Sequence, residues 1–63
     1  MAKVIRTWIG TRPCDYQVSL TQFEYSDGTT NHWLFRDRKG FPYNPESQEE
    51  VDQIIKAWAL VED

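Results

Sequence analysis

The chain has 63 residues, a formal net charge of −3, and only one cysteine and one histidine. A chain this short buries only about 60% of its unfolded surface, so we interpret residues 1–63 as a single small α+β domain. One cysteine excludes a disulfide within the chain. One cysteine and one histidine also leave too few ligands for a structural zinc site.

The charge is unevenly distributed along the chain. Residues 1–40 carry six basic and four acidic side chains, whereas residues 41–63 carry one basic and six acidic side chains. The acidic third fits an ordinary solvated helix face. The alternative is a dipolar molecule in which a mildly basic sheet is joined to an acidic helix.

The expected location of the protein follows from what its sequence lacks. No stretch approaches the roughly 20 apolar residues of a membrane-spanning helix, and the first residues lack the apolar segment of a signal peptide. A lone cysteine suits a reducing compartment. We therefore expect a cytoplasmic protein without a membrane partner. From size alone, it fits the accessory proteins that small viral or mobile genomes encode.

The first predicted element is a strand over residues 3–11, which are rich in β-branched and aromatic side chains. Alternation places Ile5 and Ile9 on one face of this strand, and Arg6 and Trp8 on the other. Because two isoleucines make the better core pair, we expect Arg6 and Trp8 to face outward.

A second strand is predicted within residues 16–26, where Val18 and Leu20 alternate with polar side chains. Phe23 falls on the polar side of this two-residue period. A β-bulge near residues 21–22 would return Phe23 to the apolar face, and we predict a bulge there.

An Asp-Gly pair within residues 26–31 predicts a hairpin loop, because glycine adopts positive φ without steric cost. The third strand then covers residues 32–37. Trp33 and Phe35 share one side of this strand, and the other side, which includes Arg36, is a poor core face. We expect Trp33 and Phe35 to point into the core.

The last element is a helix that follows the proline-rich connector 41–45. Ser47 and Glu50 form the pattern of a capping box, in which each side chain binds the backbone amide of the other. Apolar residues follow at spacings of three and four, which is typical of an amphipathic helix: Val51, Ile54, Ile55, Trp58 and Val61. The predicted fold class is α+β, a three-stranded antiparallel sheet packed by one C-terminal helix (β-β-β-α).

The sequence predicts no catalytic, metal or cofactor site. Cys14 has no predicted helix amino terminus beside it to lower the thiol pKa, and His32 is the only imidazole that could activate it. The paired carboxylates lie at the solvated start of the helix, and the scattered glycines form no phosphate-binding loop. We therefore expect a protein that is not an enzyme and has no small-molecule substrate.

Nine aromatic side chains are more than so small a core can enclose. Tryptophan, tyrosine and arginine dominate interface hot spots, so we predict a protein partner or a homo-oligomer that binds through the sheet surface or a sheet edge. Nucleic-acid binding through the sheet is the alternative, although an isoelectric point near 4.9 opposes it. The candidate partner-binding residues are Arg6, Trp8, Arg36, Phe41 and Tyr43.

Overall fold

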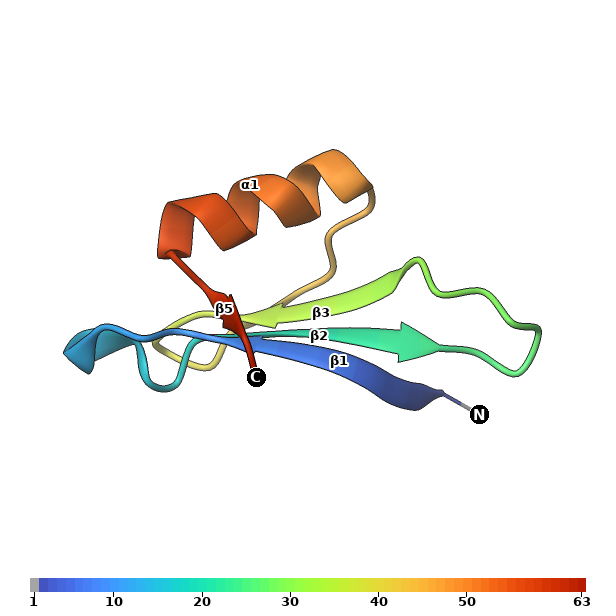
Figure 1. The fold of residues 1–63 in the computed structure, drawn as a ribbon, viewed down its shortest axis with the longest axis horizontal. Helices are drawn as coiled ribbons and strands as arrows, with labels where there is room; N and C mark the ends of the chain where they lie inside the picture. The colour runs from blue at the N-terminus through green and yellow to red at the C-terminus, as the bar shows by residue number, and fades with distance from the viewer. Residues whose placement is uncertain (1) are drawn as a thin grey trace.

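A computed structural model describes residues 2–63 (Figure 1). Its strands form one antiparallel sheet in the spatial order β4-β3-β2-β1-β5. The elements in chain order are β1 (Lys3–Ile9), the 3₁₀ helix η1 (Pro13–Asp15), β2 (Ser19–Glu24), β3 (His32–Arg36), β4 (Pro42–Tyr43), α1 (Gln48–Trp58) and β5 (Val61–Glu62).

The α+β class and the single helix packed on an antiparallel sheet agree with the sequence-based prediction, but the sheet has five strands instead of three. The two additional strands are short and lie at the edges. In β4, Pro42 and Tyr43 pair with Arg36 and Phe35, a position that suits proline because an edge strand does not need every amide hydrogen. In β5, Val61 and Glu62 pair with β1.

The helix begins and ends with well-defined caps. The Ser47 hydroxyl accepts a hydrogen bond from the Glu50 amide, as predicted. The Glu50 carboxylate instead accepts a hydrogen bond from the Tyr43 hydroxyl, which ties the helix start to β4. At the other end Ala59 adopts the left-handed conformation with φ 51°, and the Leu60 amide bonds back to the Ile55 carbonyl. This is the hydrogen-bonding pattern of a Schellman motif.

The helix carries the chain across one face of the sheet. It leaves the sheet at the β4 edge, lies over the middle strands and returns to the opposite edge as β5 (Figure 1). Ala59 forms the left-handed turn at the end of α1, after which Leu60 is buried and the chain enters β5. One face of the sheet is thereby covered, and we refer to it as the inner face.

The core lies between α1 and the inner face. Its buried apolar residues are Trp8, Val18, Leu20, Trp33, Phe35, Val51 and Leu60, with Ile54, Ile55 and Trp58 packed against them. The inward orientation predicted for Trp33 and Phe35 is confirmed. Val61, which the helical spacing had assigned to the apolar stripe, lies instead in β5 and is exposed.

The prediction that Trp8 faces outward is wrong. Trp8 is only 8% exposed, pairs with Leu20 across the strands, and packs against Trp33 with ring centroids 5.6 Å apart. Ile9 lies on the other face. A tryptophan removes more apolar area from water than an isoleucine does, so the face with Trp8 becomes the core face.

The predicted bulge near residues 21–22 is also wrong. The register of β2 with β3 is continuous, and the irregularity lies in β1 between Val4 and Arg6. Gln22 occupies the inward position because its amide finds two partners there. Its Oε1 accepts a hydrogen bond from Arg6 Nε at 2.8 Å, and its Nε2 donates to the Thr30 carbonyl at 2.7 Å.

Replacing Ala59 by glycine is expected to stabilise the protein by about 1 kcal/mol, because the left-handed conformation costs an L-residue about 1–2 kcal/mol and glycine almost nothing. The matched control is Ala57→Gly within α1, which is expected to destabilise by about 1 kcal/mol. Urea unfolding of both variants measures the difference. If both variants changed the free energy of unfolding in the same direction, the role assigned to the cap would be contradicted.

Candidate interaction surface

The face of the sheet opposite α1 is covered by no helix within residues 2–63 (Figure 1). Side chains of directly paired residues share a face, so the strand register arranges this surface in three rows. We call it the open face. Its rows are Val4–Phe23–His32, Asp63–Thr7–Thr21–Leu34 and Val61–Ile9–Ser19–Arg36–Pro42, where the Asp63 amide donates a hydrogen bond to the Thr7 carbonyl.

The open face exposes several apolar side chains among polar ones. Val4 is 54% exposed, Val61 50% and Ile9 36%, while Phe23 and Leu34 are half-buried. The charged residues of the three rows are Arg36, next to the β4 edge, and Asp63, at the β5 edge. Monomeric proteins seldom expose large contiguous apolar patches unless the patch has a partner.

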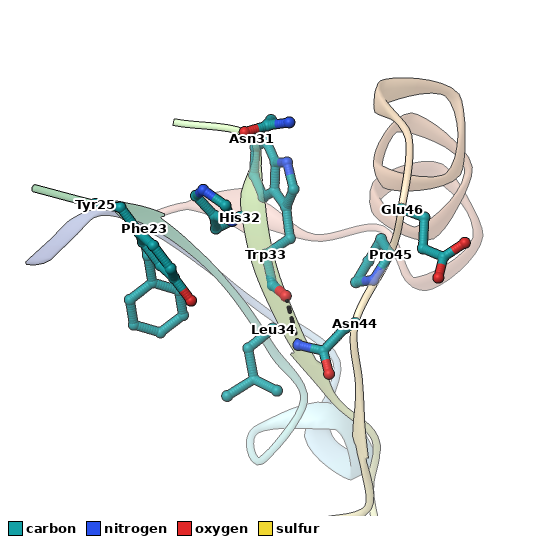
Figure 2. A pocket seen from close by; sticks show the side chains of 9 residues that line it. All are labelled: Phe23, Tyr25, Asn31, His32, Trp33, Leu34, Asn44, Pro45 and Glu46. Atoms are coloured by element: carbon teal, nitrogen blue, oxygen red, sulfur yellow. Dashed lines mark hydrogen bonds between the residues drawn. The ribbon is translucent and has the colours of Figure 1, made fainter. Parts of the chain in front are cut away.

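A hollow of about 570 Å³ lies beside the open face, where the hairpin end of β3 meets the connector to α1 (Figure 2). Phe23 and Leu34 of the open face line it, and Tyr25 stacks on His32 with ring centroids 3.7 Å apart. Across the hollow, the Asn44 side chain donates a hydrogen bond to the Trp33 carbonyl at 2.9 Å. The lining of the hollow therefore includes both apolar side chains and polar groups at the edge of β3.

Both long edges of the sheet carry features that discourage strand addition. On the β3 side, the Asn44 amide occupies the Trp33 carbonyl just where β4 ends, and buried Pro45 turns the chain away. On the β1 side, the register is broken at Ile5, between the charged residues Lys3 and Arg6. Bulges, prolines and edge charges are the usual protection against edge-to-edge pairing.

The structure separates the five residues predicted to bind a partner. Arg36 lies on the open face, whereas Trp8 is in the core. Arg6 is on the inner face beyond the helix, with its guanidinium 4.7 Å from the Trp8 ring centroid and 3.9 Å from a Glu62 carboxylate oxygen. Two strands, β2 and β3, separate β1 from β4, so Arg6 and Tyr43 lie roughly 14 Å apart across the sheet.

The remaining two predicted residues belong to the β4 edge. Phe41 is 63% exposed in the turn before β4. Tyr43 is half exposed on the inner face, and its hydrogen bond to Glu50 raises the pKa of the phenol. The predicted aromatic and arginine patch is therefore not a single surface, and only Arg36 of the five contributes to the open face.

Sequence reasoning missed most of the open face because its members are aliphatic or hydroxyl-bearing instead of aromatic. Val4, Ile9 and Val61 are the most exposed of them. A usable signal was present in the first strand, in which neither face is cleanly polar. Such a pattern indicates a strand with apolar contacts on both sides, which a single helix cannot supply.

The polar cluster at the hairpin, Asp27, Thr29 and His32, does not activate a nucleophile. Hydrogen bonding from Thr29 lowers the pKa of Asp27, and the Thr29 hydroxyl donates its only proton to Asp27 Oδ1 at 2.7 Å. His32 Nε2, which is 2.7 Å from the same hydroxyl oxygen, must then be a donor. An imidazole that donates to the hydroxyl cannot act as its general base, so the cluster orders the loop.

Cys14 is an exposed free thiol. Within residues 2–63, no group of three or more His, Cys, Asp or Glu side chains is placed to hold a metal ion. Over the same residues, no helix is long and apolar enough to span a membrane.

The most strongly paired buried charge is Asp15, whose side chain is 2% exposed. Arg38 Nε donates to Asp15 Oδ1 at 2.5 Å, and the Arg38 guanidinium lies 5.3 Å from the Trp58 ring centroid. A side chain at Gly10 would clash here, because its Cβ would lie 2.2 Å from the Asp15 carbonyl oxygen. The cluster therefore joins η1, the β3–β4 turn and the end of α1.

The hydrogen bond from Arg38 holds the pKa of Asp15 below its ordinary value, against the opposing effect of burial. The same contact raises the pKa of Arg38. Paired charges of this kind also occur in catalytic sites, but here the Asp15 carboxylate is enclosed and its partner is fixed on Trp58. We assign this pair to the stability of the fold.

Comparison with known proteins adds no assignment: no protein-family model matches the chain, and neither a curated protein nor a solved structure matches it. The geometry of the described residues is therefore the basis for function.

Asp15→Asn is expected to lower stability at neutral pH and to flatten its dependence on pH. A carboxylate with a depressed folded-state pKa stabilises above its unfolded value, near 3.9, and loses that contribution as the pH falls through the folded value. Thermal unfolding between about pH 7 and pH 2 measures the slope. The control is Glu49→Gln, which alters an exposed carboxylate. An unchanged acid slope in Asp15→Asn would contradict the assignment.

Proposed function

We propose that this protein is a non-enzymatic interaction module, whose open face packs against a protein partner or a second copy of the chain. The observation that supports the proposal is the exposed apolar surface of the three rows, with Val4 and Val61 about half exposed. Burying apolar surface contributes about 25 cal/mol per Å². A partner that covers the apolar part of this face would therefore gain free energy.

The face is a better candidate than the sheet edges. An incoming strand on the β3 side would have to displace the Asn44 amide from the Trp33 carbonyl. On the β1 side it would meet the irregular register at Ile5. Packing against the open face disturbs neither edge, and it leaves every backbone hydrogen bond of the sheet in place.

Nucleic-acid binding through the sheet is less well supported. Phe23, Tyr25 and His32 could stack on bases, but Arg36 is the only permanent positive charge in the three rows. Affinity for nucleic acid depends on several Lys or Arg contacts to phosphates. A cytoplasmic location remains part of the proposal, since the exposed Cys14 thiol suits a reducing compartment.

Site-specific photo-crosslinking tests the proposal. A photoreactive amino acid at Thr21, in the middle row of the open face, is expected to cross-link to protein in a lysate of the source cells. The same group at Gln53, which is exposed on α1, serves as the matched control. Cross-linking from Thr21 that is lost in an Ile9→Asp background supports the proposal, because a buried carboxylate at an interface is costly.

Equal cross-linking from Thr21 and Gln53, or none from Thr21, would contradict the open face as the binding surface. Fluorescence anisotropy with labelled single- and double-stranded oligonucleotides examines the alternative. Binding that weakens steeply with salt, and that is lost in Arg36→Gln, would favour nucleic acid over protein.

A further inference from the structure

We infer that the end of the molecule built around the Asp15–Arg38 pair binds single-stranded nucleic acid. The hydrogen bond within this pair, together with the contact of the Arg38 guanidinium with the Trp58 ring, holds three segments in one place. They are residues 10–17 with η1, residues 37–41 of the β3–β4 turn, and residues 55–58 at the end of α1. We call this surface the basic end.

The basic end is positively charged although the whole chain is negative. Its three segments carry four basic and two acidic side chains, whereas the rest of the chain carries three basic and eight acidic side chains. Both carboxylates of the basic end already have partners. Asp15 is buried against Arg38, and Asp37 Oδ1 accepts hydrogen bonds from two backbone amides of its own turn. The charge that remains for a ligand is therefore positive.

Three cations of the basic end are exposed and free of ion pairs: Arg12, Lys39 and Lys56. The ion pairs within residues 2–63 are Arg6 with Glu62 and Arg38 with Asp15. A ligand phosphate can therefore contact Arg12, Lys39 or Lys56 without displacing a carboxylate.

Arg12 and Arg36 lie close to the segments that hold the basic end together. The Arg12 carbonyl accepts a hydrogen bond from the Asp15 amide at 2.8 Å. The hydrogen bond from Arg38 is the main cause that lowers the pKa of Asp15, and the nearby Arg12 charge adds to it. At the border with the open face, Arg36 Nη1 donates to the Gly40 carbonyl at 3.2 Å.

The two most exposed aromatic side chains of residues 2–63 also belong to the basic end. Tyr16 is 74% exposed and follows Asp15 directly, and Phe41 is 63% exposed and lies three residues after Arg38. Because one residue spans at most about 3.5 Å, both aromatic residues lie within roughly 10 Å of the Asp15–Arg38 pair along the chain. The exposed rings and the unpaired cations therefore form one surface.

This combination selects single-stranded nucleic acid as the ligand. Lys and Arg contacts to phosphates supply affinity for any nucleic acid, but an unpaired strand also presents bases that stack on aromatic side chains. A duplex or an acidic peptide would use the cations and leave Tyr16 and Phe41 in water. The inference is independent of the proposed function, because the apolar part of the open face takes no part in it.

The acidic remainder of the chain leaves the basic end accessible to a polyanion. Six of the eight remaining carboxylates belong to residues 24–27 at the β2–β3 hairpin and residues 46–52 at the start of α1, away from η1 and the β3–β4 turn (Figure 1). The longest dimension of the molecule is 37 Å. The Debye length at physiological salt is about 8 Å, so most of the repulsion from those carboxylates is screened.

Fluorescence anisotropy of the full chain tests the inference, with labelled oligo(dT) and oligo(U) of about 12 nucleotides. Binding to either is expected at low salt. Three phosphate contacts give a slope of about −2 for the logarithm of affinity against that of salt concentration, or roughly a 15-fold loss between about 50 mM and about 200 mM. No binding at about 20 mM salt, or equal or tighter binding of a duplex, would overturn the inference.

Two pairs of variants locate the site. Lys39→Gln is expected to reduce the salt slope by about 0.7, and Lys3→Gln, which alters an exposed lysine outside the basic end, to leave it unchanged. Tyr16→Ala is expected to lower the affinity at least about fivefold without changing the slope. Its control is Tyr25→Ala, at the hairpin. Equal effects within either pair would overturn the inference.

Fluorescence of the buried Trp8 and Trp33 verifies that each variant is folded. If Tyr16→Ala does not fold, Phe41→Ala replaces it. Loss of binding in Arg36→Gln, with Lys39→Gln and Tyr16→Ala unaffected, would place the nucleic acid on the open face and overturn the basic end as its site.

Competition with poly-L-glutamate distinguishes nucleic acid from an acidic protein. At equal charge, unlabelled oligonucleotide is expected to displace the labelled strand at least about fivefold more effectively, because poly-L-glutamate has no bases to stack. Equal displacement would assign the basic end to an acidic protein and overturn the inference. Cross-linking from Thr21 is unaffected by any of these outcomes, so the proposed function is tested separately.

Discussion

The arrangement of the sheet depends on the buried amide of Gln22. A polar side chain in a core position is costly unless its hydrogen bonds are satisfied, and here Arg6 and the Thr30 carbonyl satisfy them. Strand β2 can therefore keep a strict two-residue alternation from Leu20 onward. The consequence on the other side is that Phe23 points away from the helix, and the open face acquires its aromatic member.

The composition of the core and of the open face depends on which residue of β1 points toward α1. Trp8 and Ile9 are adjacent, and only one of them can lie beneath α1. Trp8 takes the inner position against Trp33, which leaves Ile9 on the open face beside Val61. The domain thus obtains a dense aromatic core, and it does so by leaving aliphatic side chains in contact with solvent. That exposed surface is the basis of the proposed interaction.

The helix contributes more than an apolar stripe. By crossing from the β4 edge to the β5 edge it places Glu49, Glu50 and Asp52 on the inner side of the sheet. Its two ends are fixed by contacts to the sheet region: Tyr43 binds Glu50 at the start, and Arg38 lies over Trp58 at the end while binding buried Asp15.

Local sequence patterns are enough to predict the α+β class, the three central strands, the hairpin loop, the Ser47 cap and the inward side of β3, because each depends on local periodicity or turn chemistry. Three features follow only from packing in three dimensions: the side of β1 that is core, the position of the register break, and the two short strands that extend the sheet. Those outcomes depend on partners distant in the chain, such as Trp33 for Trp8 and Arg6 for Gln22. Alternation along a strand shows that its two faces differ. Which of the two faces is buried depends on packing against the helix.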